Sequence, residues 1–346
     1  MKKLLLTTAV AALAATPAFA GEGVKLSVGG HAKVYLGYIN SDEAAGVDER
    51  SIDIYSEKEI HLSGETTLDN GLTVGAHFEL DADENDDSNV EESYIYMSGD
   101  WGRVNVGAED GVAYLLQVAA PSADSNVDGL RQYIQGDFSA TRLDYDQATT
   151  GKDEKISYLS PVFGGAQLGL TYVPEVGGAD AAIGTTNQED NDISEEAYEV
   201  ALRYEGAFEE VGFTVGAGFT HVEEGTGAAG LGDQGVWNVG ADLDFGPFGL
   251  GVVYMEDDQE NTGSDQEVET FVIGADYTTG AFKLGASYFN QDDEGTDIEH
   301  DRYTGGVVYT YGPGMTFRGS VSFQEEDTAA ADNDTTAVML GTQINF

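Results

Sequence analysis

Cysteine is absent from this chain of 346 residues, which excludes a disulfide framework, a thiolate zinc site and a cysteine nucleophile. Basic residues are scarce, because 15 Lys and Arg stand against 63 Asp and Glu and give a formal net charge of −48. A surface of that charge excludes nucleic acid as a partner. Proline supplies 6 positions and glycine 46, a balance that favours a β-rich chain. Intrinsic disorder is excluded, since 41% of the residues are hydrophobic.

The first twenty residues have the pattern of a signal peptide. Lys2 and Lys3 form a positive start, residues 4–15 are mostly apolar, and small residues precede a cleavage position after Ala20. Residues 1–20 are therefore expected to be removed, with residues 21–346 as the mature chain. No later segment approaches the roughly 20 consecutive apolar residues of a transmembrane helix. The exported protein should be either soluble or a β-barrel.

Period-two alternation of apolar and polar residues, the signature of half-buried strands, recurs along the mature chain. It predicts sixteen strands: residues 24–38, 60–68, 72–82, 90–98, 103–109, 155–160, 166–173, 197–205, 213–221, 237–245, 248–255, 269–277, 282–291, 302–311, 315–324 and 338–346. In residues 90–98 the two faces cannot be assigned, since Tyr94 and Tyr96 compete with Ile95 and Met97 for the apolar face.

The connections between these segments alternate in length. Every second one is short and turn-like, for example Asp69-Asn70-Gly71 and Gly312-Pro313-Gly314. The others are long, and five acidic stretches hold about half of all carboxylates and no Lys or Arg: residues 81–92, 175–196, 256–269, 291–301 and 325–334. Short turns at one end and long loops at the other are typical of outer-membrane barrels.

Aromatic residues give an independent indication. On the apolar face they gather near the long-loop ends, as at Trp237 and Tyr254, and near the short-turn ends, as at Phe245 and Phe248. Two such belts are expected at the two interfaces of a membrane. The core of a soluble β-sandwich is the alternative, but it would not leave its middle without aromatics.

Three stretches carry a family resemblance. They are Glu92 to Gly107 (ESYIYMSGDWGRVNVG), Ser157 to Gly165 (SYLSPVFGG) and the closing strand that ends in Phe346. Over residues 21–346 the chain resembles a general-diffusion porin of Gram-negative bacteria, most similar to the alphaproteobacterial, Rhodobacter-like type. The resemblance implies the outer membrane, a homotrimer, contact with lipid and lipopolysaccharide, and recognition of the Phe346 strand by the barrel assembly machinery.

The expected fold is therefore all-β: a 16-stranded antiparallel transmembrane β-barrel with an inward-folded third loop, about residues 109–153. This loop contains the apolar runs 112–116 and 130–134, which are unsuited to a loop left in water. In similar porins the loop narrows the channel. That role implies a basic wall facing an acidic loop across the constriction: Lys33, Arg103 and Arg318 opposite Asp110, Asp124, Asp128 and Asp137.

The expected function is passive diffusion of small hydrophilic solutes and ions, with a preference for cations that the acidic loops suggest. A plugged outer-membrane barrel with a structural or adhesive, cation-binding surface is the alternative. No required cofactor and no catalytic residue is expected, because no serine lies in a nucleophile-elbow sequence. Ca²⁺ could bind through oxygen ligands at acidic loops such as Asp257-Asp258.

Overall fold

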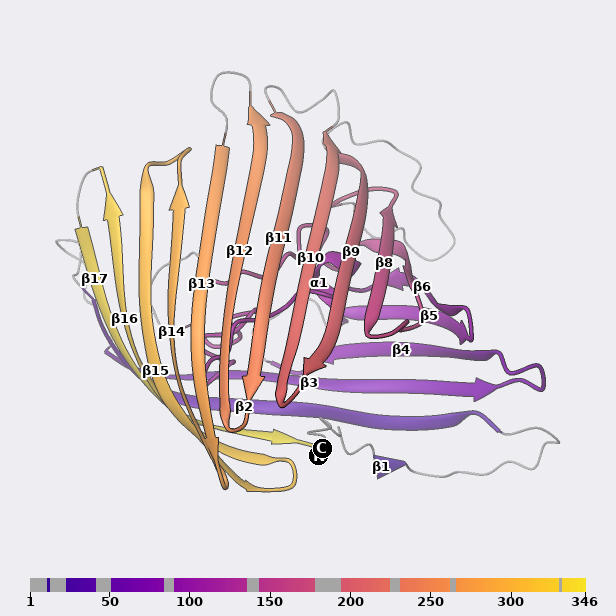
Figure 1. Ribbon diagram of the computed structural model, residues 1–346, viewed down its shortest axis with the longest axis horizontal. Helices are drawn as coiled ribbons and strands as arrows, with labels where there is room; N and C mark the ends of the chain where they lie inside the picture. Colours follow the sequence, from indigo (N-terminus) through magenta and orange to yellow (C-terminus); the bar gives the residue numbers. More distant parts are fainter. Residues whose placement is uncertain are drawn as a thin grey trace.

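The computed structural model describes residues 11–12, 23–41, 51–83, 90–135, 143–177, 194–224, 231–261, 266–329 and 332–346. Strands β2 to β17 form a closed antiparallel barrel (Figure 1). The strands are β2 (Lys25–Ser41), β3 (Ile52–Thr67), β4 (Thr73–Asp81), β5 (Glu92–Gly99), β6 (Gly102–Ala108), β7 (Glu154–Leu159), β8 (Ala166–Val173), β9 (Ser194–Phe208), β10 (Val211–Glu224), β11 (Leu231–Phe245), β12 (Phe248–Asn261), β13 (Gln266–Thr279), β14 (Phe282–Asp293), β15 (Ile298–Gly312), β16 (Met315–Thr328) and β17 (Asp332–Asn345).

Neighbours in sequence are neighbours in the sheet, and β17 closes the barrel on β2. Leu340 lies opposite Leu36, and the backbones of Gly30 and Phe346 exchange two hydrogen bonds of 3.1 Å. In Figure 1, β2 to β4 run across the direction of β9 to β13, as tilted strands on different sides of a barrel do. Closure leaves no sheet edge, so the strand backbones are paired where lipid offers no partner.

A further strand of two residues, β1 (Ala11–Ala12), pairs with Val28 and Ser27 of β2. It lies within the segment expected to be cleaved as a signal peptide, and cleavage stays a prediction. Among the described residues, no helix is long and apolar enough to cross a membrane.

The two faces of the strands follow the predicted alternation. In β2 the side chains of Leu36 and Tyr38 are exposed on the outer face, whereas Tyr35, the residue before Leu36, is fully buried on the inner face. The structure also settles the strand with ambiguous faces: Ile95 is 57% exposed on the outside, and Tyr96 is 8% exposed on the inside. An apolar outer face and a polar inner face are what a barrel with an aqueous lumen requires.

The strands extend further into the acidic stretches than predicted. Asp257 and Asp258 belong to β12, Asp292 and Asp293 belong to β14, and the connection between β14 and β15 shrinks to residues 294–297. The boundaries assigned to these loops were therefore wrong. The physical reason is that backbone pairing continues beyond the apolar band, where side chains no longer alternate in polarity and the periodic signal ends.

Candidate functional site in the barrel interior

In the connection from β6 to β7, the described residues 109–135 and 143–153 pack on the inner wall and include the helix α1 (Val112–Leu115), which contacts β9 and β10 (Figure 1). Its first limb crosses inward-facing glycines, here called the glycine track: Gly169, Gly216, Gly240, Gly251, Gly274 and Gly285. A Cβ at Gly274 would lie 1.8 Å from the carbonyl oxygen of Pro121, and one at Gly285 would lie 2.5 Å from the amide nitrogen of Ala123. The loop backbone fills the space of the missing side chains, so the inward-folded loop is confirmed.

Asp124 fixes the middle of the loop to the wall. Its buried carboxylate lies 2.7 Å from Nη1 of Arg318 on β16 and accepts a 2.9 Å hydrogen bond from the Tyr35 hydroxyl on β2. Asn126 donates to the Tyr35 oxygen at 2.9 Å and to Gln343 of β17 at 3.0 Å. One carboxylate and one amide thus hold the loop to three strands on both sides of the barrel closure.

Arg302 of β15 ties both limbs of the loop. Its Nη2 lies 3.0 Å from Asp128 of the outgoing limb, and its Nη1 donates a 2.7 Å hydrogen bond to the carbonyl of Leu143 in the returning limb. Ser287 also donates to Asp128. Arg302 and Asp128 are 2% and 3% exposed, so this ion pair lies outside the solvent-filled lumen.

A second group of charges holds the base of the loop together. Asp110 lies 3.2 Å from Arg131 and 2.6 Å from Lys152, which also contacts Glu92 of β5. Arg131 is 2.6 Å from Asp146. Burial lowers the pKa of the Lys152 ammonium, but the adjacent carboxylates of Asp110 and Glu92 outweigh it and raise the pKa above its ordinary value. Lys152 therefore stays charged.

The remaining predicted wall residues are placed as follows. The Lys33 ammonium lies 2.6 Å from Glu57 and 3.2 Å from the centre of the Tyr133 ring, and Lys33 is only 3% exposed. The Arg103 guanidinium lies 4.0 Å from the centre of the Tyr96 ring. Both side chains lie on the inner face of the barrel, Lys33 on β2 and Arg103 on β6, but Lys33 is covered by Tyr133 of the loop.

The contacts differ from an arrangement of opposed charges across open water. Arg318 and Asp124 form a direct ion pair. Asp110 and Asp128 pair with basic residues that were not predicted as wall residues: Arg131, Lys152 and Arg302. Asp137 lies outside the described residues. Strand parity offered a signal for Arg302, since Tyr303 faces outward. The loop acids therefore fasten the loop, and their part in limiting the pore stays a prediction.

A cavity of about 350 Å³ lies between the loop and the wall formed by β11, β13 and β14. Its charged lining comprises Arg131 from the loop and Asp242, Asp276 and Lys283 from the wall. Lys283 lies 3.0 Å from Asp276, and the Asp242 carboxylate lines the same cavity. This part of the interior can accept a hydrated cation or a small polar solute.

Glu109, at the start of the loop, accepts hydrogen bonds of 2.8 and 2.9 Å from the Asn105 amide. Burial raises the pKa of the Glu109 carboxyl to about 7. Its charge therefore changes near neutral pH, at the point where the loop leaves β6.

Two groups of inward-facing side chains combine imidazole and carboxylate ligands that a metal ion could use. They are His31, Glu59 and His61, and His61, His77 and Glu79. The inner face of β2 to β4 presents both groups.

Comparison with known proteins matches this architecture. The family model for Gram-negative porins covers residues 7–329. An anion-selective porin from Comamonas acidovorans superposes with a TM-score of 0.70 at 18% identity, covering 94% of this chain and 100% of that one. A mutant of the Rhodopseudomonas blastica porin superposes with a TM-score of 0.59 at 20% identity, covering 93% and 100%. Among curated proteins, none matches the sequence.

A closed barrel of tilted antiparallel strands with an apolar outside, a polar inside and an infolded loop defines an outer-membrane channel. The chain belongs to the Gram-negative porin family. It is therefore an outer-membrane protein of the diffusion-channel class, and members of this family act as channels and not as enzymes.

Proposed function

We propose that the protein is a general-diffusion porin that passes small hydrophilic solutes and ions and prefers cations. The observation that carries the preference is the neutralisation of the basic side chains. Most of the described Lys and Arg pair with carboxylates: Lys33, Lys58, Arg131, Lys152, Arg203, Lys283, Arg302 and Arg318. Because these basic side chains are paired, the excess of Asp and Glu over Lys and Arg gives the protein a negative net charge, and a permeating ion meets that charge.

Selectivity does not follow from the fold, since the Comamonas acidovorans structure is described as an anion-selective porin. The discriminating measurement is the reversal potential of the purified channel in a planar bilayer across a KCl gradient. A cation-directed potential that shrinks as salt rises is expected, because the screening length falls from about 8 Å at 0.15 M to about 3 Å at 1 M. An anion-directed potential would contradict the preference. Silence from folded protein would favour the plugged, structural alternative.

A homotrimer is part of the proposal, supported by an asymmetry of the outer face. The outer aromatic pairs in ring contact lie on β8 to β16, for example Trp237 with Tyr254 and Phe245 with Phe248. The outer faces of β2 and β3 are chiefly aliphatic, with Ile52 and Ile54 60% and 69% exposed. A face with few aromatics, here Tyr38 alone on the outer faces of β2 and β3 as described, suits contact with another subunit better than contact with lipid headgroups. Native mass spectrometry should give three copies, and Ile54→Arg should dissociate them.

Other partners rest on sequence features. The alphaproteobacterial type rests on three stretches together: Glu92 to Gly107, Ser157 to Gly165 and the closing strand that ends in Phe346. Recognition by the barrel assembly machinery rests on that closing strand. Lipid and lipopolysaccharide would contact the outer face and the acidic strand ends. Ca²⁺ at these ends is a proposal of the same kind, for which Glu256, Glu267 and Glu269 are the nearest group of oxygen ligands. Calcium-dependent stabilisation of the barrel would test it.

A further inference from the structure

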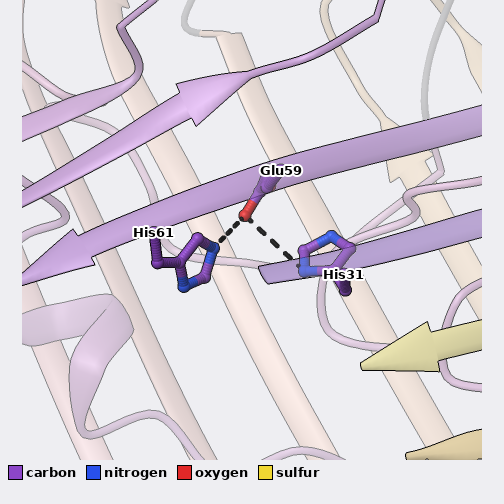
Figure 2. A group of neighbouring side chains, drawn as sticks. All are labelled: His31, Glu59 and His61. Atoms are coloured by element: carbon purple, nitrogen blue, oxygen red, sulfur yellow. Dashed lines mark hydrogen bonds and ion pairs between the residues drawn. The ribbon is translucent and has the colours of Figure 1, made fainter. Parts of the chain in front are cut away.

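Histidine and glutamate side chains alternate across the inner faces of β2, β3 and β4, and we call this set the histidine wall: His31, Glu59, His61, His77 and Glu79. The register places His31 opposite Glu59 and His61 opposite Glu79, so the rings and carboxylates meet across neighbouring strands. Figure 2 shows Glu59 between the rings of His31 and His61. Its Oε2 lies 2.8 Å from Nε2 of His61 and 3.8 Å from Nδ1 of His31.

The remaining ring nitrogens have carboxylate partners of their own. Nε2 of His31 lies 2.6 Å from Glu57, and Nδ1 of His61 lies 3.6 Å from Glu79. Histidines that ligate metals almost always donate their other N–H to a carboxylate, carbonyl or water, which fixes the ring and its tautomer. Each ring of this trio therefore has one nitrogen beside an outer carboxylate, as metal-ligating histidines do, and its other nitrogen towards Glu59.

The donor set selects the kind of ion. Two imidazole nitrogens and one carboxylate oxygen suit Zn²⁺ and related transition metals, whereas Ca²⁺ and Mg²⁺ prefer oxygen alone. The three donor atoms lie within 4.8 Å of one another. Zn–N bonds of about 2.0–2.1 Å put the ligand atoms of a tetrahedral site ~3.4 Å apart. Side-chain rotations that move the donor atoms of His31 and Glu59 by about 1 Å would bring the three donor atoms to that spacing.

Charge and access favour a cation at this place. The carboxylates of Glu59, Glu79 and Glu91 lie within 4.8 Å of one another. Lys33 is the adjacent ammonium, and it is bound to Glu57. The side chain of His61 is 31% exposed, which opens the trio to the lumen and leaves a position for water on the ion.

We propose that His31, Glu59 and His61 form a binding site for a divalent transition-metal ion of the Zn²⁺ type on the channel wall. The neighbouring residues His77 and Glu79 are not part of this site, because Glu79 is hydrogen-bonded to His77 at 3.0 Å and faces His61 only from the side away from Glu59, at 3.6 Å. His31 also lies beside Tyr133 of the infolded loop, with ring centres 6.4 Å apart. A bound ion places two positive charges next to the loop and reduces cation current.

The primary test is equilibrium binding of Zn²⁺ to the full chain, folded in detergent, which does not depend on conduction. His61→Ala and His31→Ala should each weaken Zn²⁺ binding at least about tenfold. Glu57→Gln, which removes the carboxylate partner of His31 and leaves the Lys33 ammonium unpaired beside the site, should also weaken it at least about tenfold. His221→Ala is the matched control, since His221 on β10 lies outside the wall and faces Asp233 at 3.9 Å. Equal Zn²⁺ affinity in wild type and His61→Ala would overturn the proposal, as would a loss in His77→Ala that exceeds the loss in His31→Ala.

Bilayer recordings supply the functional readout. Micromolar Zn²⁺ should reduce the wild-type current reversibly, and Mg²⁺ at equal ionic strength should not. An equal effect of Mg²⁺ would show simple charge screening and contradict the site. Unchanged zinc-free conductance of the variants shows that they fold. If a histidine variant fails to form channels, Glu57→Gln decides, because unchanged Zn²⁺ binding there contradicts the oriented trio.

Discussion

The interior of the barrel has two different walls. The glycine track on β8 and β10 to β14 has no side chains at the loop level and is covered by residues 112–123, whereas the histidine wall on β2 to β4 carries charged side chains that bond to one another. The difference shows how the path of the loop is encoded. A backbone can lie flat only where Cβ atoms are missing, so the glycines select the wall that the loop covers.

The charged side chains of the interior also fall into two groups, those that attach the loop and those that are exposed to the lumen. Beside the glycine track, on β15 and β16, the buried ion pairs Asp128–Arg302 and Asp124–Arg318 attach the loop. On the side of the histidine wall, side chains such as His61 are partly exposed to the lumen. Attachment and contact with solutes are thus assigned to separate residues, and each can be altered alone.

Deleting residues 111–140 should produce the largest effect, because it uncovers the glycine track. The narrowest part of a pore dominates its resistance, so single-channel conductance should rise at least about twofold. Planar-bilayer recording measures it directly. An unchanged conductance would show that this loop does not limit the channel.

Adding a single methyl group at Gly274 of the glycine track should weaken the packing of the loop against the barrel wall. In Gly274→Ala the new Cβ meets the Pro121 carbonyl at 1.8 Å, and backbone cannot yield as a flexible side chain does. Overpacking of this kind costs about 1–3 kcal/mol. Conductance should rise or fluctuate, and the loop should become sensitive to protease.

Gly212→Ala is the matched control for this substitution. Gly212 also faces inward, on β10, but its nearest neighbour to an added Cβ is Asp244 at 3.5 Å, an ordinary contact. Equal behaviour of the two variants would mean that the track does not position the loop.

Removing one partner of a buried ion pair should free the middle of the loop. Asp124→Ala leaves Arg318 uncompensated and strips the Tyr35 hydroxyl of its acceptor, for which losses of about 3–5 kcal/mol are typical. Hydrogen exchange should accelerate at the amide of Val127, which donates to the Asp124 carbonyl. For comparison, Glu205→Ala removes an exposed pair with Arg203 and should cost less than about 1 kcal/mol. Similar losses would show that Asp124 is no anchor.

The sequence predicts the barrel well because membrane strands repeat one rule. All sixteen predicted segments are strands, and Ala166–Val173 has the predicted bounds. Alternation fails where water replaces lipid on the outside, which is why β3 begins at Ile52 and not at Ile60. Beyond the membrane, the hydrogen bonds between neighbouring strands form whether or not one face of the strand is apolar.

The partners of the loop could not be predicted, because they are set by its path through space. Asp124 and Arg318 are 194 positions apart, and nothing local marks them as a pair. The glycine track did leave a signal, since Gly216 and Gly240, and Gly251 and Gly274, fall on inward positions of neighbouring strands. Inward-facing glycines in several successive strands predict a part of the barrel wall on which the backbone of an infolded loop can pack.

The smallest effect should come from pH at the root of the loop. Burial raises the Glu109 pKa to about 7 from an ordinary value of 4.5. The folded state therefore holds this proton more tightly than the unfolded state, so its stabilising contribution is complete below pH 4.5 and is lost as pH rises through 7. Attachment of α1 should weaken over that range.

Glu109→Gln isolates this contribution, because its amide is neutral at every pH. At pH 8 the amide of Leu116, which donates to the Val112 carbonyl at 3.1 Å, should exchange faster in wild type than in Glu109→Gln. At pH 4 the two proteins should exchange alike, and comparison at equal pH removes the intrinsic dependence of exchange on hydroxide. A difference that grows towards acid would reverse the sign and assign the stabilising form to the carboxylate.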